Sequence, residues 1–256
     1  MLVGEIRKDL PHIGTRKLLH LIKPKLEEQR LNIGRDYLFE LLSNHKMLIR
    51  TRRRKAITTD SNHWMRKYSN LIKELQLYRP EQLWVSDITY IRLTNGFAYL
   101  SLITDAYSHK IMGYNLRKDM SAEGCLNALE MALTNRSLLN QQLIHHSDRG
   151  SQYCCKAYVD KLTTHNIAIS MTENGDPYEN AIAERLNGIL KTEFKLYGIQ
   201  VSFEDSIKMV EQSIITYNQR RPHASCDYLT PDQAHLKSGL FKKRWKNYFQ
   251  NSFTNP

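Results

Sequence analysis

The sequence predicts an α/β fold in which a mixed sheet is flanked by helices and preceded by a small all-α unit. The first observation is charge: residues 1–79 hold 18 Lys and Arg against 8 Asp and Glu, a net of +10, whereas residues 80–256 hold 19 against 18, a net of +1. The second is pattern, because helical periodicity precedes Pro80 and segments rich in β-branched and aromatic residues follow it. We therefore place a domain boundary near Pro80.

Residues 1–58 are predicted to form the basic helical unit. Apolar residues recur at helical spacing from Thr15 to Arg30 and again in GRDYLFELLSNHK, with LNIG as a short turn between the two segments. Two short helices so joined resemble a helix-turn-helix, although any αα-hairpin has the same pattern. A basic cluster follows: Arg50, Arg52, Arg53, Arg54 and Lys55. Because it comes after two candidate DNA-binding helices, a nucleic-acid contact is favoured over a merely solubilising loop.

Residues 59–80 are predicted to be a connector that ends in a short helical stretch marked by Trp64, Tyr68, Leu71 and Leu75. Residues 81–198 then read as βββ-α-β-α-β-α, a mixed sheet with helices on its faces. LWVSDITYIRL, FAYLSLITDAY and HKIMGYNLR form an antiparallel meander whose first turn is Asn95-Gly96. QYCCKAYVDKLTTHN and AIAERLNGILKTEF are two of the expected helices. Residues 199–256 are a C-terminal helical extension, with an amphipathic helix from Phe203 to about residue 217.

Three carboxylates lie in local settings where an ordinary surface acid is unexpected. Asp87 lies within an apolar strand, so either a cation compensates its charge or it lies at an exposed sheet end, although a salt-bridged structural Asp is the alternative. Asp148 directly follows a strand, where ligands bind in α/β sheets, although a turn or cap residue fits equally well. Glu184 begins a helix and shares a face with Asn187 and Lys191, which on an isolated helix is the pattern of a surface stripe.

The arrangement of these acids is more informative than any one of them. They come from a strand, a strand end and a helix, and such elements can bring side chains to one point. Carboxylate oxygens are the ligands that Mg²⁺ prefers beside phosphate oxygens. Two such ions about 4 Å apart activate a nucleophilic oxygen and stabilise a leaving oxygen in displacement at phosphorus. We therefore predict that Asp87, Asp148 and Glu184 bind metal and catalyse phosphoryl transfer on nucleic acid.

Other chemistries have less support. The four cysteines form no CxxC pair, and neither a Walker-type phosphate loop nor a nucleophile-elbow motif occurs. Asp105 is interpreted as structural, whereas His145 and His146 could tune or shield Asp148, with His146 favoured as a packing or hydrogen-bonding residue. No apolar run is long enough to span a bilayer, and no signal-peptide core is present at the start, so cytoplasmic residence without membrane association is expected.

Six stretches together resemble one family. They are WVSDITYI, YLSLITDAYSHKIMGY, HHSDRGSQY, NGDPYENAIAERLNGILKTEF, YNQRRPH and LTPDQA. In this order, and with 35 residues between Asp148 and Glu184, the chain resembles the bacterial insertion-sequence transposases of the OrfB type, in the DDE transposase and retroviral integrase superfamily. The resemblance runs from about Gly14 to Ala234.

The resemblance implies an RNase H-like integrase catalytic core in which Asp87, Asp148 and Glu184 hold Mg²⁺ (Mn²⁺ is an alternative), with two ions expected. It implies that Lys191 contacts DNA near the transposon end. The implied reaction is metal-dependent cleavage at the element's ends, followed by strand transfer by the freed 3′-OH. The implied partners are double-stranded element ends and target DNA, with a homo-oligomer assembled on DNA at the nucleoid.

Family members commonly work as a longer fusion with an upstream frame that carries another helix-turn-helix and a coiled coil. This chain has no heptad run and looks abbreviated at its start, so an upstream-frame product or fusion is an expected partner. Two other functions stay open. One is a DNA-binding regulatory product that competes with the fusion, and the other is an RNase H-like nuclease acting on hybrids or junctions.

Overall fold

A computed structural model of the chain describes residues 2–49, 64–173, 180–197 and 201–242. Five strands form one sheet: β1 (Leu83–Arg92), β2 (Phe97–Asp105), β3 (Ile111–Arg117), β4 (Ile144–Ser147) and β5 (Ala168–Met171). Their order in the sheet is β3-β2-β1-β4-β5. The first three strands pair antiparallel, whereas β1–β4 and β4–β5 pair parallel. The predicted mixed sheet and its antiparallel meander are therefore confirmed.

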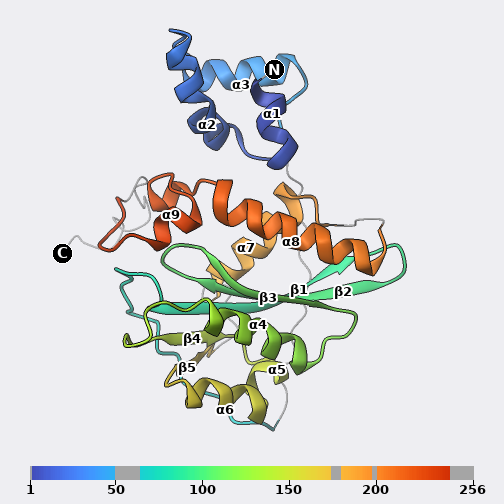
Figure 1. Cartoon of the computed structure of the whole chain (residues 1–256), viewed down its shortest axis with the longest axis vertical. Helices are drawn as coiled ribbons and strands as arrows, with labels where there is room; N and C mark the ends of the chain where they lie inside the picture. The colour runs from blue at the N-terminus through green and yellow to red at the C-terminus, as the bar shows by residue number, and fades with distance from the viewer. Residues whose placement is uncertain (1, 50–63, 174–179, 198–200, 243–256) are drawn as a thin grey trace, which may run out of the picture.

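Helices cover both faces of this sheet (Figure 1). One face carries α4 (Ala122–Thr134), α5 (Ser151–Cys154) and α6 (Lys156–Thr164). The other face carries α7 (Ala181–Glu193), α8 (Phe203–Arg220) and α9 (Pro231–His235). Alternate side chains of each strand point to opposite faces, so Trp84 packs with the α4 and α6 side while Ile91 packs with the α7 and α8 side. The sheet thus separates two hydrophobic cores.

The N-terminal unit contains three helices, α1 (Leu2–Asp9), α2 (Thr15–Glu28) and α3 (Arg35–Asn44), stacked beyond α7 and α8 (Figure 1). The two predicted helices are confirmed within two residues at each end, whereas α1 was not predicted. Buried side chains of α2 and α3, such as Leu18 and Leu38, belong to the same hydrophobic cluster as those of α7 and α8. The basic cluster at residues 50–55 lies outside the described residues, and its DNA contact stays a prediction.

Two sequence predictions are wrong. The stretch from Trp64 to Leu75 forms no helix: it runs alongside the end of β5, where the backbone N–H groups of Asn70 and Leu71 donate to Glu173 and Ser170. These long-range bonds satisfy the backbone in place of helical ones. The single helix predicted over 152–166 is instead two helices, because Cys155 takes an extended conformation between them. In the ranges that the structure describes, no helix has the length and apolarity to cross a membrane.

Gly113 is expected to be the hardest to replace among the glycines that the structure describes. It lies in β3 against α4, where an added Cβ would stand 2.0 Å from Ala128 O and 2.7 Å from Ala132 N. These are backbone atoms of a packed helix and cannot rotate away. Gly113→Ala should therefore destabilise the protein by about 3 kcal/mol or more in urea unfolding, at the upper end of overpacking effects.

Gly188, inside α7, is the matched control. No atom lies within 4 Å of a Cβ added there. Gly188→Ala should raise stability by up to about 1 kcal/mol, because glycine is the poorer helix former. Equal effects of the two substitutions would contradict the packing argument.

Candidate active site

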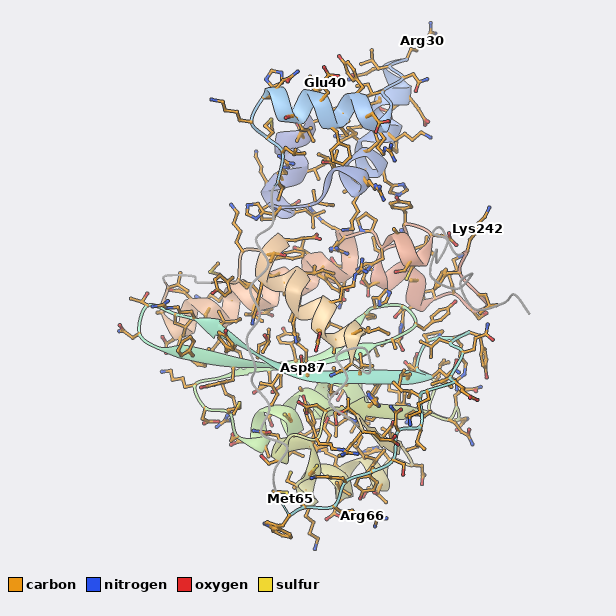
Figure 2. All side chains as sticks on the ribbon, turned by 180° about the vertical axis from the view of Figure 1, so that it is seen from behind. Arg30, Glu40, Met65, Arg66, Asp87 and Lys242 are labelled. Atoms are coloured by element: carbon orange, nitrogen blue, oxygen red, sulfur yellow. The ribbon has the colours of Figure 1, made fainter. Side chains whose placement is uncertain are left out.

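The two aspartates occupy corresponding positions on neighbouring parallel strands. The last paired residues of β1 and β4 are Val85 and His146, and Asp87 and Asp148 each follow two positions later. Because parallel strands advance together, equal offsets bring both carboxylates to the same place at the sheet. Both side chains line one cavity of about 220 Å³. Figure 2 shows Asp87 on the sheet, beside α7.

Helix α7 is fixed across this part of β1 by two amides. At its N-terminus, Asn180 donates from Nδ2 to the carbonyl oxygen of Ser86 at 3.1 Å. Further along, Asn187 donates from Nδ2 to Asp87 Oδ2 at 2.6 Å. Glu184 lies between them in the first turn of α7 and is exposed. The third acid is therefore carried on a helix that hydrogen bonds attach to β1.

The electrostatics show that the charges of Asp148 and Glu184 reach Asp87. Burial, then the charge of Asp148 and, more weakly, that of Glu184, raise the pKa of Asp87 to about 7 against an ordinary value of 3.8. Hydrogen bonds from the Ile88 N–H (2.9 Å to Oδ1) and from Asn187 oppose this rise without cancelling it. Asp87 is thus poised between its charged and neutral forms near neutral pH.

This donor set suits a hard divalent cation. Its groups are carboxylate oxygens. Burial, and then the charges of Asp148 and Glu184, raise the pKa of Asp87, and a bound cation would offset these effects by favouring the charged carboxylate. Among the described residues, no three His, Cys, Asp or Glu side chains already lie close enough to hold an ion. Glu184 is also absent from the residues that line the cavity of Asp87 and Asp148. The predicted metal-binding role of the three acids therefore stays a prediction that their chemistry fits.

Cation binding is expected to tighten as pH rises through about 7. Asp87 must lose its proton to act as a ligand, and its pKa is raised to about 7. The stability of the cation-free protein should change in the opposite direction. Because the pKa of Asp87 is higher in the folded protein than in the unfolded chain, protonation of Asp87 favours folding. The free energy of unfolding should therefore fall as pH rises from about 4 to about 7. Calorimetric titration with Mg²⁺ on either side of neutrality checks the first statement. An affinity that does not change with pH would contradict it.

Lys191 lies on α7 beside Tyr90, and its predicted contact with DNA stays a prediction. Its ammonium group stands 4.3 Å from the ring centroid of Tyr90 and lies near enough to Asp87 for that charge to act on it. Burial lowers the pKa of Lys191, and the charge of Asp87 partly offsets this. The structure thus brings Lys191 against Tyr90, which lines the cavity of Asp87 and Asp148, and the contact of Lys191 with DNA belongs to the proposal below.

The remaining candidates, Asp105, His145 and His146, take part in buried hydrogen bonds. Asp105 accepts hydrogen bonds from the Glu81 N–H at 2.6 Å and from the Ser108 N–H at 2.8 Å, which agrees with a structural role. His145 is shared between the hydroxyls of Ser86 and Tyr158, and burial lowers the pKa of His145 to about 3, so it is neutral.

His146 and the residues next to the acids make further hydrogen bonds near the site. His146 hydrogen-bonds through Nδ1 to Ser170 Oγ at 2.8 Å, as the hydrogen-bonding interpretation expects. Three groups that sequence reasoning missed hold the site: Asn180, Asn187 and the Gly150 N–H, which donates to Asp148 Oδ1 at 3.0 Å. The helical spacing of Asn187 from Glu184 was visible in the sequence, but its bond to Asp87 was not.

A five-stranded mixed sheet of this order, with helices on both faces and two aspartates that line one cavity, is typical of the RNase H-like class of polynucleotidyl transferases. Comparison with known proteins agrees. Residues 78–177 match one family model described as "Integrase core domain", and residues 165–231 match a second model with the same description. The structure is similar to the simian T-cell lymphotropic virus intasome chain, with a TM-score of 0.54 and 18% identity over 95% of this chain and 79% of that one.

Similar proteins of known insertion elements identify the family of this chain. The chain is 33% identical over 220 residues to an uncharacterized 31 kDa protein of insertion element IS600 from Shigella sonnei, covering 85% of this chain and 79% of the relative. It is 36% identical over 170 residues to a putative transposase of IS986/IS6110 from Mycobacterium tuberculosis, covering 64% of this chain and 60% of that relative. The chain belongs to the insertion-sequence transposases of the DDE transposase and integrase superfamily.

Proposed function

We propose that this chain catalyses cleavage and strand transfer at the ends of an insertion sequence, with Asp87, Asp148 and Glu184 as its catalytic acids. The observation that carries the proposal is the matched position of the two aspartates on β1 and β4, with the charge of Glu184 acting on Asp87. Family membership supports the reaction class. The chain spans only 60% of the IS6110 relative, so the complete reaction is assigned to this polypeptide as a proposal.

The three carboxylates would hold divalent cations, Mg²⁺ with Mn²⁺ as the alternative, and two ions suit the chemistry. When bound, such ions activate the attacking oxygen and stabilise the leaving oxygen at phosphorus. The chain's own groups orient the ligands: Asn187 and the Ile88 N–H hold the Asp87 carboxylate, and the Gly150 N–H holds that of Asp148. This hydrogen bonding restricts the carboxylates before DNA arrives, which lowers the cost of assembling the site.

DNA would be held by positively charged side chains. Lys191 contributes the ammonium group nearest to Asp87 on α7, in position for a backbone phosphate next to the cleaved bond. The N-terminal helices and the basic cluster at residues 50–55 supply the remaining contacts with element ends and target DNA. Two ends must be joined in one complex, so a homo-oligomer on DNA, with an upstream-frame product or fusion as an additional partner, belongs to the proposal.

The test is an end-cleavage and strand-transfer assay. The purified chain is mixed with duplexes carrying the termini of its element, with Mg²⁺, Mn²⁺ or chelator, and with or without the upstream-frame product. Metal-dependent 3′-OH ends and joined products support the proposal. DNA binding with no cleavage under any of these conditions would overturn it in favour of a regulatory DNA-binding product. Cleavage of RNA–DNA hybrids alone would favour a nuclease.

A further inference from the structure

The segment before β1 passes around one edge of the sheet. That edge is formed by β5, the last strand in the sheet order. Met65 and Tyr68 pack against the hydrophobic cluster on the α4 and α6 side, and Figure 2 shows Met65 at the end of the molecule opposite the N-terminal helices. A few residues later, Ile72 and Leu75 pack against a cluster on the α7 side. The chain therefore changes faces around β5, and we term residues 65–77 the edge clamp.

Hydrogen bonds and an ion pair attach the edge clamp to the end of β5. The Leu71 N–H donates to Ser170 Oγ at 2.9 Å, and the Asn70 N–H donates to Glu173 Oε1 at 3.1 Å. The other carboxylate oxygen of Glu173 pairs with the ammonium group of Lys73. Two side chains of the β5 end thus accept from successive backbone N–H groups of the clamp, which fixes its course along this strand.

Ser170 also connects the edge clamp to the strand that precedes Asp148. Its Oγ forms a second hydrogen bond, to His146 Nδ1 at 2.8 Å. His146 lies on β4, two residues before Asp148. Ser170 and His146 are both 0% exposed, so water does not compete for this bond. A displacement of the clamp at Leu71 would therefore act on a residue close to Asp148.

The apolar side chains of the edge clamp pack against the cluster that contains the first turn of α7. Ala183, directly before Glu184, is 3% exposed. The buried members of its cluster are Leu83, Val85 and Ala106, and the partly buried members include Ile72, Leu75 and Leu77 of the clamp. Because Ala183 and Glu184 are adjacent in one helical turn, a shift of the buried side chain also moves the exposed carboxylate.

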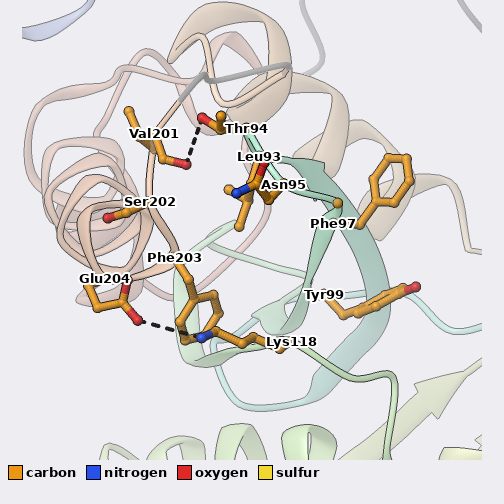
Figure 3. A pocket seen from close by; sticks show the side chains of 11 residues that line it. Leu93, Thr94, Asn95, Phe97, Tyr99, Lys118, Val201, Ser202, Phe203 and Glu204 are labelled. Carbon is orange, nitrogen blue, oxygen red and sulfur yellow. Dashed lines mark hydrogen bonds and ion pairs between the residues drawn. The ribbon is translucent and has the colours of Figure 1, made fainter.

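Helix α8 is attached to the sheet at a different place, the tip of the β1–β2 hairpin (Figure 3). There Thr94 donates to the carbonyl oxygen of Val201 from its N–H at 3.4 Å and from Oγ1 at 3.3 Å. Lys118 pairs with Glu204 at 3.6 Å. None of these contacts involves the edge clamp or the three acids. The hairpin tip therefore offers a comparable exposed ion pair that serves as a control for the clamp.

We propose that the edge clamp is a positioning element of the active site. Ile72 and Leu75 hold the first turn of α7, while the bonds to the end of β5 hold the clamp itself, so that Glu184 keeps its position relative to Asp148. The inference rests on the proposed function, because it takes Glu184 to act in the reaction. It goes beyond that function: side chains that neither bind metal nor react, on the segment that joins the N-terminal unit to β1, set the rate of cleavage.

Leu75→Ala, compared with Leu71→Ala, tests the proposal. Leu71 lies on the same segment, but its side chain is 48% exposed and does not belong to the cluster. At saturating DNA and Mg²⁺, Leu75→Ala should lower the single-turnover rate of end cleavage by about tenfold or more, because small displacements of reacting groups are costly. Its DNA affinity in chelator should stay unchanged. Leu71→Ala should change neither quantity, and Leu75→Met, which conserves volume, should keep most of the rate.

Hydrogen exchange of the protein without DNA or metal gives a readout that does not depend on activity. In Leu75→Ala the amides of α7 should exchange at least about tenfold faster, while those of α4, in the other core, keep the wild-type rate. Glu173→Gln loses the ion pair with Lys73 but keeps an acceptor for the Asn70 N–H, so it should give a smaller change of the same kind. Glu204→Gln, the matched change at the hairpin tip, should give none.

The two readouts together decide the inference. Unchanged exchange of α7 in Leu75→Ala would overturn it, as would an equal increase in α4 and α7, which is the result of a merely structural role. Faster exchange of α7 with an unchanged cleavage rate would also overturn it, because the position of Glu184 would then not depend on the clamp. A wild-type chain that cleaves no DNA end with Mg²⁺ overturns the proposed function instead, and the exchange of α7 then still supports or overturns the attachment of α7 to the clamp.

Discussion

Asp87→Asn is expected to lower DNA-end cleavage by at least about a hundredfold. In the proposed site the substitution would remove a charged oxygen ligand. Cations at phosphoryl-transfer sites supply several kcal/mol of transition-state stabilisation, and each 1.4 kcal/mol equals about tenfold in rate. Asp148→Asn and Glu184→Gln should have effects of the same order. Single-turnover cleavage of end duplexes at saturating Mg²⁺ measures the loss, while DNA binding in chelator should persist.

Asp87→Asn should not damage the fold. The asparagine can still accept from the Ile88 N–H through its oxygen, while its amide replaces the oxygen that faces Asn187. Asn187 Oδ1 is buried with no hydrogen-bond partner, so turning the Asn187 amide over lets it accept from the new amide. Burial and the neighbouring acids already disfavour a charge at this position. Above neutral pH, in chelator, the variant should therefore be at least as stable as wild type.

This combination separates catalysis from stability. A variant that loses cleavage and melts at a lower temperature would show only that Asp87 is structural. Retention of full Mg²⁺-dependent cleavage by any of the three variants would remove that residue from the proposed site. Asp105→Asn is the contrasting control, because Asp105 is fully buried and accepts from Glu81 and Ser108, so its loss should cost stability first.

The elements that the sequence predicted well are those whose pattern is local. The β1–β2 hairpin follows from alternating β-formers around Asn95-Gly96, and Gly96 takes the positive φ of +91° that such a turn needs. Helix α7 follows from its apolar periodicity, and this places Glu184 and Lys191 on their face. Asp148 and Glu184 could be found because the end of a strand and the start of a helix are both visible in the sequence.

The features that were missed depend on partners distant in the chain. The stretch around Leu71 carries a helical pattern, yet its backbone bonds to residues 99 and 103 positions away decide its conformation. The bond from Asn187 to Asp87 joins residues 100 positions apart. No local pattern records such a contact. The same limit applies to the matched offset of Asp87 and Asp148, which appears only once β1 and β4 are paired.

Glu193→Ala is expected to destabilise the protein by about 3–5 kcal/mol, the cost of removing one partner of a buried ion pair. Glu193 ends α7 and accepts two hydrogen bonds from Arg221, at 2.9 Å from Nε and 2.8 Å from Nη2, and one from Lys17 at 3.3 Å. The side chain of Arg221 is 1% exposed, so water could not take the place of the Glu193 carboxylate beside its charge. The cluster joins α2, α7 and the segment after α8.

The stability of the protein should also depend on pH through Glu193. Burial raises the pKa of Glu193, but the hydrogen bond and charge of Arg221, with Lys17, outweigh burial and lower it below 4.5. A lowered folded-state pKa in an acid means that the stabilisation is complete above the unfolded-state pKa and is lost as pH falls through the folded one. Wild type should therefore lose stability below about pH 4 more steeply than Glu193→Gln does.

Asp9→Ala is the matched control, because Asp9 pairs with Arg220, the residue before Arg221, at an exposed position. An exposed pair is worth about 1 kcal/mol or less. Replacing both buried partners with apolar residues, as in Glu193→Leu with Arg221→Met, should recover much of the loss, since no buried charge is then left unpaired. If Glu193→Ala cost no more than Asp9→Ala in urea unfolding, the cluster would not hold α7. The fixed position of Glu184 would then come from Asn180, Asn187 and the apolar packing of α7.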